Sequence, residues 1–461
     1  MKSNADKTNT SSGGIQAISQ HEDRKYDTIP FRLDFIKDLL KDGSLETVVD
    51  FDNIETETFT HPNGHLKQDN ISNGNLFEDG NKTVEDNDIR NILNKKKYNF
   101  SKIIMELGGK LRYIKSGTTG HTFKGSIIVD NSSCINYGVK VVAYPKKARY
   151  GDMNDINRPE NAELMMIRLL SYFVVKKQTP HIALPISFFN TSILHFTKLI
   201  EENYVDKDNK KYKEFVERYK KGEYYDTVSI LLSEWANRGD LLDFIKKNYK
   251  EFTTLHWKVI FFQILSVLAV IQSKFPSFRH NDAKVNNILI HKIAQRGTIF
   301  SYSVCRKKYY VPSIGYLIKL WDFDFSCIPG VVENTKVSAS WTDEINVKPV
   351  QNRYYDMHYF FNTLIRKGFF PELMTDPSIS REIKDFVNRV VPPKYQYGSN
   401  VAERGRILVD DEYLTPNQVL RTDPFFEEFR NYKPKKIISL SSPQTSDNIR
   451  KKYVLNTDNT K

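Results

Sequence analysis

The chain has 461 residues, 39% of them hydrophobic, and its 68 lysine and arginine residues against 56 aspartate and glutamate residues give a net charge of +12. This length and hydrophobic content can bury a sizeable core, which excludes a small disulfide-held scaffold. The three cysteines stand at spacings that suit neither a zinc site nor a disulfide framework, so they favour a reducing compartment.

The first 98 residues differ in composition from the rest of the chain. They are rich in Asn, Asp, Thr and Ser and carry a charge of −5, which leaves +17 for the remainder. We expect this extension, residues 1–98, to be polar and largely disordered with one or two short helices, and residues 34–40 are a candidate docking segment. The N-terminus lacks the basic and then apolar pattern of a secretory signal, so secretion is not expected.

A glycine-containing turn precedes the first strong β pattern. Its residues are Lys115, Ser116, Gly117, Thr118, Thr119, Gly120, His121 and Thr122. Glycines allow a tight turn and a close approach of the backbone to phosphate groups, although an ordinary hairpin turn is the alternative. The β-rich run 137–142 then contains Lys140, and a helical pattern after Pro159 carries two acids, Glu160 and Glu163.

Two further segments follow before the middle of the chain. The insertion 203–226 is rich in lysine interleaved with acids and tyrosines, and residues 211–221 within it predict a short exposed helix between two strands. Residues 229–245 read as an apolar strand, a polar turn and the start of an amphipathic helix. The longest apolar run, 259–272, is too short to span a bilayer and predicts a buried helix.

That buried helix leads into a segment with the side chains needed to move a phosphoryl group from ATP. Phosphoryl transfer requires a group that receives or orients the acceptor proton, together with metal ligands. Asp282 fits the first role, and Asn287 and Asp322 have the hard oxygen atoms that Mg²⁺ prefers. Lys284 can neutralise charge on the transferring group. A polar turn before a strand is the alternative for an isolated segment of this kind.

The C-terminal part contains an insertion, a helix and a polar tail. The insertion 291–318 separates the two segments that carry the carboxylates. A helical pattern over 354–364 has Asp356 near its start, where a carboxylate interacts favourably with the helix dipole. The apolar segment 414–429 follows, and the tail 433–461 is polar.

The order of these segments resembles the eukaryotic-type serine/threonine protein kinases. Residues 280–287 resemble the catalytic loop H-R-D-L-K-x-x-N, 322–324 resemble D-F-G, and 414–429 resemble the last kinase subdomain. Asn281 replaces the arginine of the loop and Asp324 replaces the glycine. With the long insertion, these departures resemble most closely the late serine/threonine kinase family of poxviruses and its relatives in large DNA viruses.

The resemblance implies an α+β, bilobal protein-kinase-like fold. The kinase domain would span 99–432, with a small β-rich lobe with one helix over about 99–236 and a larger, mainly helical lobe over about 237–432. Lys140 would bind the α- and β-phosphates, with Glu163 or Glu160 as its ion-pair partner.

The resemblance also implies the rest of the nucleotide site. The turn Lys115–Thr122 would cover the phosphates, the backbones of Glu234 and Ala236 would hold the adenine, and Asp240 would lie near the ribose. Asp356 would brace the backbone of the catalytic loop.

The expected activity is transfer of the γ-phosphoryl group of ATP, with Mg²⁺ or Mn²⁺, to serine or threonine of proteins, acidic ones among them. By the same resemblance, the enzyme is virus-encoded and acts in the host-cell cytoplasm and in the virus particle. Three alternatives stay open: a small-molecule kinase of the choline or aminoglycoside type, a pseudokinase scaffold, and a basic nucleic-acid-binding module. The basic body permits contact with nucleic acid or a membrane surface, but a solvated lysine-rich surface is the favoured explanation for its charge.

Overall fold

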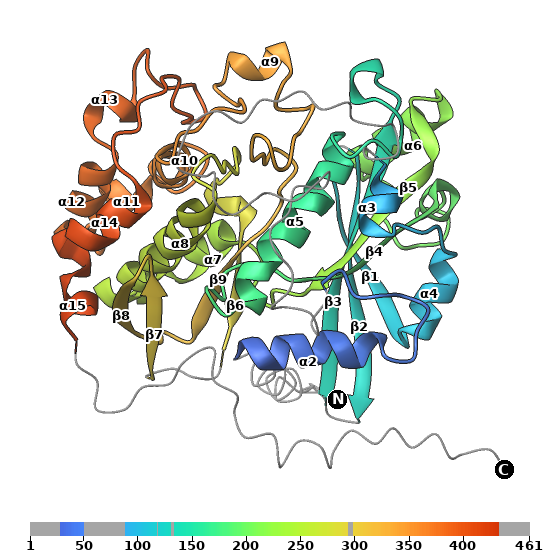
Figure 1. Ribbon diagram of the computed structural model, residues 1–461, viewed down its shortest axis with the longest axis horizontal. Helices are drawn as coiled ribbons and strands as arrows, with labels where there is room; N and C mark the ends of the chain where they lie inside the picture. The colour runs from blue at the N-terminus through green and yellow to red at the C-terminus, as the bar shows by residue number, and fades with distance from the viewer. Residues whose placement is uncertain (1–27, 50–87, 118, 131–132, 294–297, 433–461) are drawn as a thin grey trace, which may run out of the picture.

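The small lobe is built on a five-stranded antiparallel sheet (Figure 1). The computed structural model describes residues 28–49, 88–117, 119–130, 133–293 and 298–432. The strands are β1 (Gly109–Ser116), β2 (Gly120–Asp130), β3 (Ser133–Pro145), β4 (Pro185–Ser192) and β5 (Tyr224–Glu234), in the order β1-β2-β3-β5-β4. Strands β3 and β5 pair with each other inside the sheet. Their apolar side chains, such as Val139, Val141 and Ile230, are buried.

Helix α5 (Pro159–Val175) lies between this sheet and the large lobe (Figure 1). A proline at its first position supplies the backbone torsion that a helix start requires and lacks only an N–H that would have no partner there. Most of its side chains are buried, because the helix is covered on one side by the sheet and on another by the large lobe. Helix α5 is therefore the helix expected in the small lobe, but it is not the single one, because α4 (Phe100–Glu106) and α6 (Lys210–Lys220) also lie within the residues predicted for that lobe.

Parts of the N-terminal stretch are folded against the small lobe. They form α2 (Ile29–Leu40) and α3 (Ile89–Leu93), and α4 (Phe100–Glu106) follows at the start of the predicted kinase domain. Helix α2 packs its Ile29, Phe35, Ile36 and Leu40 into the core, so the candidate docking segment does lie on the domain. Residues 1–27 and 50–87 of the predicted disordered extension, and the tail from 433, lie outside the described residues. The domain boundary at residue 98 stays a prediction.

Helix α8 (Thr254–Lys274) forms the centre of the large lobe. It is the one helix among the described residues that is long and apolar enough to cross a membrane, but 78% of its apolar window is buried inside the protein. This burial is that of a core helix, as the apolar run predicted. The other helices of the lobe are α7 (Leu241–Asn248), α9 (Ser340–Asp343), α10 (Tyr355–Leu364), α11 (Glu372–Thr375), α12 (Arg381–Val390), α13 (Pro393–Gln396), α14 (Pro416–Thr422) and α15 (Glu427–Asn431).

Two short antiparallel ladders complete the large lobe. Strands β6 (Ile288–Lys292) and β9 (Tyr316–Leu320) pair with Ile288 opposite Leu320. The second insertion forms the hairpin β7 (Ile299–Val304) and β8 (Lys307–Pro312) against α8 and α15. Because β6 and β9 are antiparallel, the residues just before β6 and just after β9 come to the same end of the ladder.

The first insertion forms α6 (Lys210–Lys220) between β4 and β5. The sequence predicted a helix over nearly the same residues. It predicted an exposed helix, but Tyr212 and Phe215 on its inner face are buried. The polar composition of α6 concealed these two anchoring side chains.

Candidate active site

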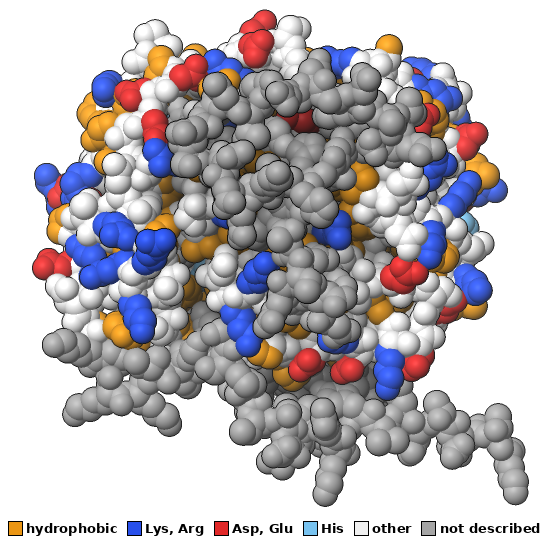
Figure 2. All heavy atoms as spheres, viewed as in Figure 1, with side chains coloured by type: hydrophobic (Ala, Val, Ile, Leu, Met, Phe, Trp, Pro, Cys, Tyr) orange, Lys and Arg blue, Asp and Glu red, His pale blue; other side chains and the backbone are white. Residues whose placement is uncertain are grey.

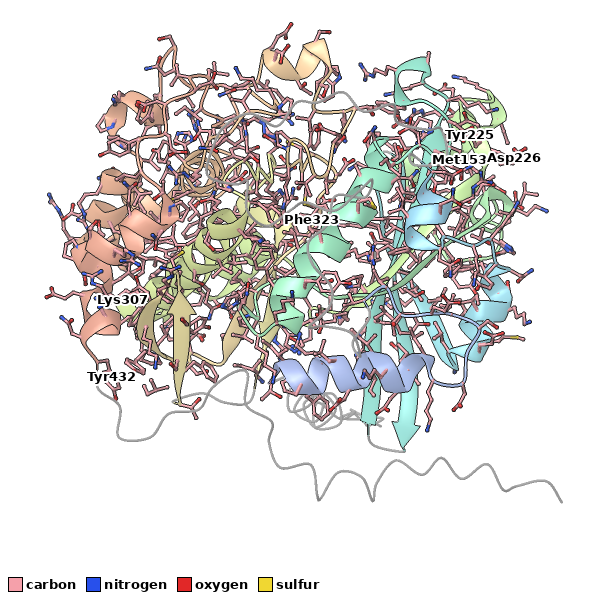
Figure 3. The ribbon with its side chains drawn as sticks, in the orientation of Figure 1. Met153, Tyr225, Asp226, Lys307, Phe323 and Tyr432 are labelled. Atoms are coloured by element: carbon pink, nitrogen blue, oxygen red, sulfur yellow. The ribbon has the colours of Figure 1, made fainter. Side chains whose placement is uncertain are left out.

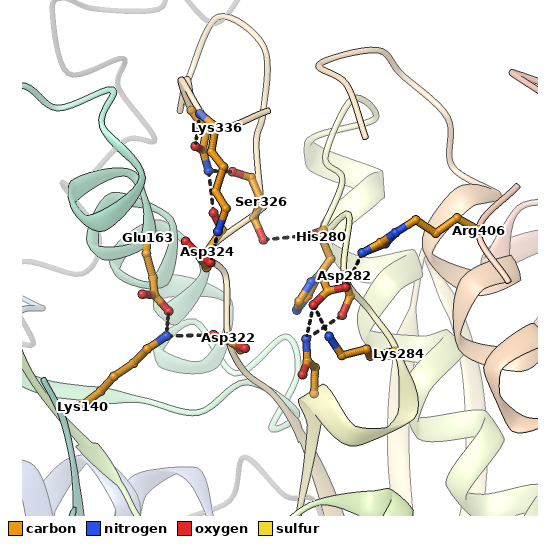
Figure 4. Close-up of polar contacts among 12 residues, drawn as sticks. Lys140, Glu163, His280, Asp282, Lys284, Asp322, Asp324, Ser326, Lys336 and Arg406 are labelled. Atoms are coloured by element: carbon orange, nitrogen blue, oxygen red, sulfur yellow. Dashed lines mark hydrogen bonds and ion pairs between the residues drawn. The ribbon is translucent and has the colours of Figure 1, made fainter. Parts of the chain in front are cut away.

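Lys140 and Glu163 form an ion pair in the small lobe (Figure 4). Lys140 Nζ lies 2.6 Å from Glu163 Oε1 on α5 and 2.8 Å from Asp322 Oδ1. The sequence left Glu160 open as the partner, but Glu160 instead pairs with Arg158 at 2.8 Å. One turn of α5 separates the two glutamates, and the helix presents Glu163 to the lysine.

The three charges of this cluster shift one another's protonation. Burial raises the pKa of Glu163 to about 7, against the opposing effect of Lys140. Burial also acts to raise the pKa of Asp322, but the adjacent ammonium of Lys140 prevails and holds it below its usual range. Lys140 stays protonated between the two carboxylates, which is the form that attracts phosphate groups.

The glycine turn joins β1 to β2 above this cluster. Gly117 N–H donates to the Gly120 carbonyl at 2.8 Å, and the Thr119 carbonyl accepts from Ala143 N–H on β3 at 2.8 Å. A Cβ atom at Gly120 would lie 1.8 Å from the Val141 carbonyl oxygen, so only glycine permits this close approach. Thr118 of the predicted loop lies outside the described residues.

The side chain of His121 does not lie on the same face of the sheet as Lys140. Thr122 pairs with Lys140 across the strands, so these two share one face, and His121 points to the opposite face. There its ring is buried, and His121 Nδ1 lies 2.9 Å from the hydroxyl of Ser116. Because side chains alternate along a strand, only the backbone of His121 can face the Lys140 side of the turn, and its place in the nucleotide site stays a prediction. The backbone of the turn and Lys115, which is exposed, remain candidates.

The link between β5 and α7 begins at Glu234, whose side chain has an arrangement that the sequence did not predict. The carboxylate of Glu234 is buried and accepts from Arg32 at 2.7 and 2.8 Å and from Lys319 at 3.1 Å. Its backbone N–H donates to the Leu184 carbonyl, so a contact with adenine would use its carbonyl oxygen. Ala236 follows in the turn, and Asp240 caps α7 through the Asp243 N–H at 3.0 Å.

The catalytic loop concentrates polar groups on Asp282 (Figure 4). Lys284 Nζ donates to Asp282 Oδ2 at 2.6 Å, and Asn287 Nδ2 donates to the same oxygen at 2.7 Å. The structure thus brings together three residues that the sequence singled out. Asp282 is 6% exposed, so its carboxylate is held by these donors rather than by bulk water.

Arg406 is a third donor to this carboxylate, and the sequence gave no signal for it. Its Nη2 donates to Asp282 Oδ1 at 2.5 Å, and its Nη1 donates to the Asn281 carbonyl at 2.9 Å. The guanidinium also lies 4.2 Å from the ring centroid of Tyr359 on α10. Both carboxylate oxygens of Asp282 consequently have a cationic donor.

Asp356 fixes the backbone of the loop from the first turn of α10. Its two carboxylate oxygens accept from the N–H groups of His280 at 2.7 Å and Asn281 at 2.9 Å. Asn281 and Asp322 both have a left-handed backbone, with φ of 61° and 67°. Such conformations persist in non-glycine residues only where the surroundings hold them, and they cluster at functional sites.

Phe323 lies at the centre of the molecule between the lobes (Figure 3). It is fully buried, and its ring centroid lies 5.1 Å from that of His280, whose Nε2 lies 3.0 Å from the Trp321 carbonyl. Asp324, which replaces the glycine of the motif, pairs with Lys336 (Figure 4). The sequence did not anticipate Lys336 as a partner.

Asn287 and Asp322 have the chemistry of a magnesium site. The antiparallel pairing of β6 with β9 brings the residue before β6 and the residues after β9 to one end of the ladder. Asn287 directs its Nδ2 to Asp282, which leaves its Oδ1 oxygen for a cation. Among the residues that the structure describes, no three His, Cys, Asp or Glu gather into a metal-binding group. Mg²⁺ usually binds one or two protein oxygens plus phosphates of the substrate, so Asn287 and Asp322 stay the predicted ligands.

Comparison with known proteins gives a family match over this region. The family model described as poxvirus serine/threonine protein kinase matches residues 142–405. That range is more than half of the chain and includes the catalytic loop, Asp322 and Asp356. Lys140, the glycine turn and Arg406 lie just outside it.

Viral proteins are similar to this chain. A protein of Acanthamoeba polyphaga mimivirus, named as a candidate serine/threonine-protein kinase, is 44% identical over 406 residues, covering 87% of this chain and 80% of that protein. Serine/threonine-protein kinase 2 of swinepox virus is 34% identical over 134 residues, 28% of this chain and 27% of that protein. The monkeypox virus protein of the same name is 27% identical over 227 residues, covering 49% and 45%.

Proposed function

Because this chain belongs to the poxvirus serine/threonine protein kinase family, we propose that its site transfers the γ-phosphoryl group of ATP to serine and threonine hydroxyls of proteins. The hydroxyl oxygen forms a bond to the γ-phosphorus as the bond from that phosphorus to the β–γ bridging oxygen breaks, and ADP leaves. The hydroxyl proton passes to Asp282. Such a transfer depends mainly on positioning and on charge stabilisation.

The observation that carries this proposal is the arrangement around Asp282. A carboxylate that orients a hydroxyl must be fixed, and Asp282 has Lys284 and Asn287 on one oxygen and Arg406 on the other. Figure 4 shows this cluster facing the pair of Lys140 and Asp322 across the site.

Each further group has a distinct task in the proposed reaction. Lys140, paired with Glu163, attracts the α- and β-phosphates, and the glycine turn covers them. Lys284 balances charge on the transferring group. A bound Mg²⁺ or Mn²⁺ would be held by Asn287 and Asp322 and would neutralise phosphate charge. The carbonyl of Glu234 and the backbone of Ala236 would hold the adenine, with Asp240 near the ribose.

The viral relatives support a proposal for the setting of the reaction. We place this chain among virus-encoded kinases that act in the host-cell cytoplasm, with the virus particle as a second location. Its partners would be ATP and protein substrates, acidic ones among them. Contact of its basic surface with nucleic acid or a membrane is not needed for any step.

A substrate panel tests the proposal against a small-molecule kinase or a scaffold. The full chain is incubated with Mg-ATP and either casein or a set of amino-alcohols and aminoglycosides, and both ATP consumption and labelled product are measured. We expect label on serine or threonine of casein. ATP consumed only with a small alcohol would contradict the proposal, and absence of any turnover would leave a scaffold.

A further inference from the structure

Helix α6 lies against the outer side of the glycine turn. It belongs to the insertion between β4 and β5, and its inner face carries Tyr212 and Phe215, which are 2% and 0% exposed. Its outer face is charged, with exposed lysines and glutamates such as Lys213 and Glu214. An amphipathic helix of this kind packs its apolar stripe on the domain.

The apolar stripe of α6 encloses His121, the residue that follows the last glycine of the turn. The His121 ring lies 4.4 Å from that of Phe215, at an angle of 67°, and 5.4 Å from that of Tyr212. Phe196 and Phe123 complete the cluster, with ring centroids 6.3 and 6.5 Å from that of His121. Aromatic pairs in such geometries contribute beyond their area burial. The C-terminal end of the turn is thus fixed to the helix.

A chain of hydrogen bonds fixes the other end of the turn. Asn209, the N-cap of α6, accepts from Tyr212 N–H at 3.1 Å and donates its Nδ2 to the Tyr113 hydroxyl at 2.7 Å. The Tyr113 hydroxyl donates to Ser116 Oγ at 2.8 Å, and Ser116 Oγ lies 2.9 Å from His121 Nδ1. Ser116 directly precedes the first glycine of the turn, so both flanks of the turn are connected to α6.

We infer that α6 is a brace that holds the phosphate-covering turn in its binding position, with His121 and Tyr113 as positioning residues. The inference rests on the proposed function, because it assigns the turn to ATP. The side chains that make the brace lie on the face opposite Lys140 and do not touch the nucleotide. The brace restricts the conformation of the turn, in which Lys115 occupies the position of the first glycine of the kinase motif.

The brace has a measurable consequence for ATP binding. The apparent affinity of a ligand falls in proportion to the fraction of protein in the binding-competent conformation. If loss of the brace leaves the turn in place for about a tenth of the time, the KM for ATP rises about tenfold. The KM for the protein substrate stays the same, because that substrate binds elsewhere.

Two variants of the full chain test the inference. Phe215→Ala removes the aromatic anchor, and Tyr113→Phe removes only the hydroxyl that joins Asn209 to Ser116. We expect the KM for ATP to rise about tenfold in the first variant and about threefold in the second, following the loss of preorganisation. Phe215→Leu, which keeps part of the apolar contact, should give an intermediate value. The matched control is Lys213→Ala on the outer face of α6, which should behave as the unaltered chain.

Direct binding of Mg-ATP, measured by calorimetry, separates this inference from the proposed function. Equal dissociation constants for the unaltered chain and Tyr113→Phe, with the fold intact by circular dichroism, would overturn the brace. Equal changes in the KM for ATP and for casein would also overturn it, since they would indicate general loss of structure. If the unaltered chain transfers no phosphate, the proposed function fails, and the binding constants still decide the brace.

Discussion

At the scale of single residues, the site is a set of buried and half-buried charges that hold one another in place. Asp282 has donors on both oxygens, and Lys140 lies between two carboxylates. Local spacing in the sequence identified Asp282, Lys284 and Asn287, because the three lie within six positions and share one loop. Arg406 could not be identified in this way, since it lies 124 positions from Asp282 in the chain.

Arg406 gives the first prediction. Replacing Arg406 with Met removes the donor to Asp282 Oδ1 and to the Asn281 carbonyl, so the carboxylate loses its orientation. We expect kcat to fall about 10- to 100-fold with little change in the KM for ATP, because small misplacements of a catalytic group are costly. Steady-state kinetics with casein measure both constants.

The conservative variant of the same residue provides the control. Arg406→Lys keeps the charge but has no planar guanidinium to donate to two acceptors at once. Its kcat should therefore lie between those of the unaltered chain and Arg406→Met. An unchanged kcat in Arg406→Met would show that this arginine does not support the reaction, and a higher kcat would show that it restrains it.

Lys95 gives a prediction about pH. It is buried, it donates to Ser229 Oγ at 2.9 Å and to the Tyr144 hydroxyl, and burial lowers its pKa to about 7. The unfolded chain keeps this proton up to about pH 10.5, so the unfolded state binds more protons between pH 7 and 10.5. Stability from this group therefore rises with pH in that window.

Replacing Lys95 with Met removes that dependence. We compare the free energy of unfolding of the unaltered chain with that of Lys95→Met. Between pH 7 and 9 we expect the first to rise by about 2 kcal/mol relative to the second. Urea unfolding of both proteins at the two pH values measures the gain. A difference between them that does not change with pH would show that Lys95 stays charged in the folded protein.

At the scale of elements, helices outside the minimal kinase pattern hold the parts of the site. Helix α6 was predictable from the sequence because its residues form a compact amphipathic segment between two strands. The packing of α2 was foreseen only as a possibility, since its central contact is a buried arginine that reads as a surface residue. Arg32 is 1% exposed and also donates to the Pro180 and Ile182 carbonyls at 2.7 and 2.6 Å.

The contact between Arg32 and Glu234 gives the element-scale prediction. Arg32→Met leaves the buried carboxylate of Glu234 with Lys319 and one N–H as partners. Removing one member of a buried ion pair typically costs about 3–5 kcal/mol of stability. We expect a loss of about 3 kcal/mol, measured as the free energy of unfolding in urea. Lys41→Met, an exposed residue just after α2, is the matched control and should have little effect.

An unchanged stability in Arg32→Met would contradict this account of α2. Helix α2 would then contribute little to the stability of the domain, and Lys319 and the Leu184 N–H would be enough to hold the carboxylate of Glu234. A loss of equal size in Lys41→Met would likewise indicate that the helix responds to any substitution.

At the scale of the whole molecule, the bilobal arrangement places two charged clusters opposite each other. The order of motifs along the chain was enough to predict this arrangement, because each motif belongs to a fixed place in the kinase fold. The positions of the inserted elements on the surface were not predictable, since they depend on contacts between residues distant in sequence. Lysine and arginine side chains are spread over both lobes on the face shown in Figure 2.

The net charge of +12 predicts a salt effect on substrate choice. A basic enzyme attracts acidic substrates over distances that salt screens. We expect kcat/KM for casein to fall at least about threefold between roughly 50 and 300 mM salt, and to change less for a neutral serine peptide. An equal salt dependence for both substrates would show that the basic surface does not steer substrates.

The most direct test of the account is phosphate transfer by Asp282→Asn compared with the unaltered chain. Label from ATP on casein is measured with Mg²⁺ and with Mn²⁺, and thermal unfolding confirms that the variant is folded. Removing a positioned proton acceptor costs about 10²- to 10⁴-fold in rate, so we predict a loss of at least that size, with Mg-ATP still bound. A folded Asp282→Asn variant that labels serine and threonine at the unaltered rate would contradict the assignment of the site.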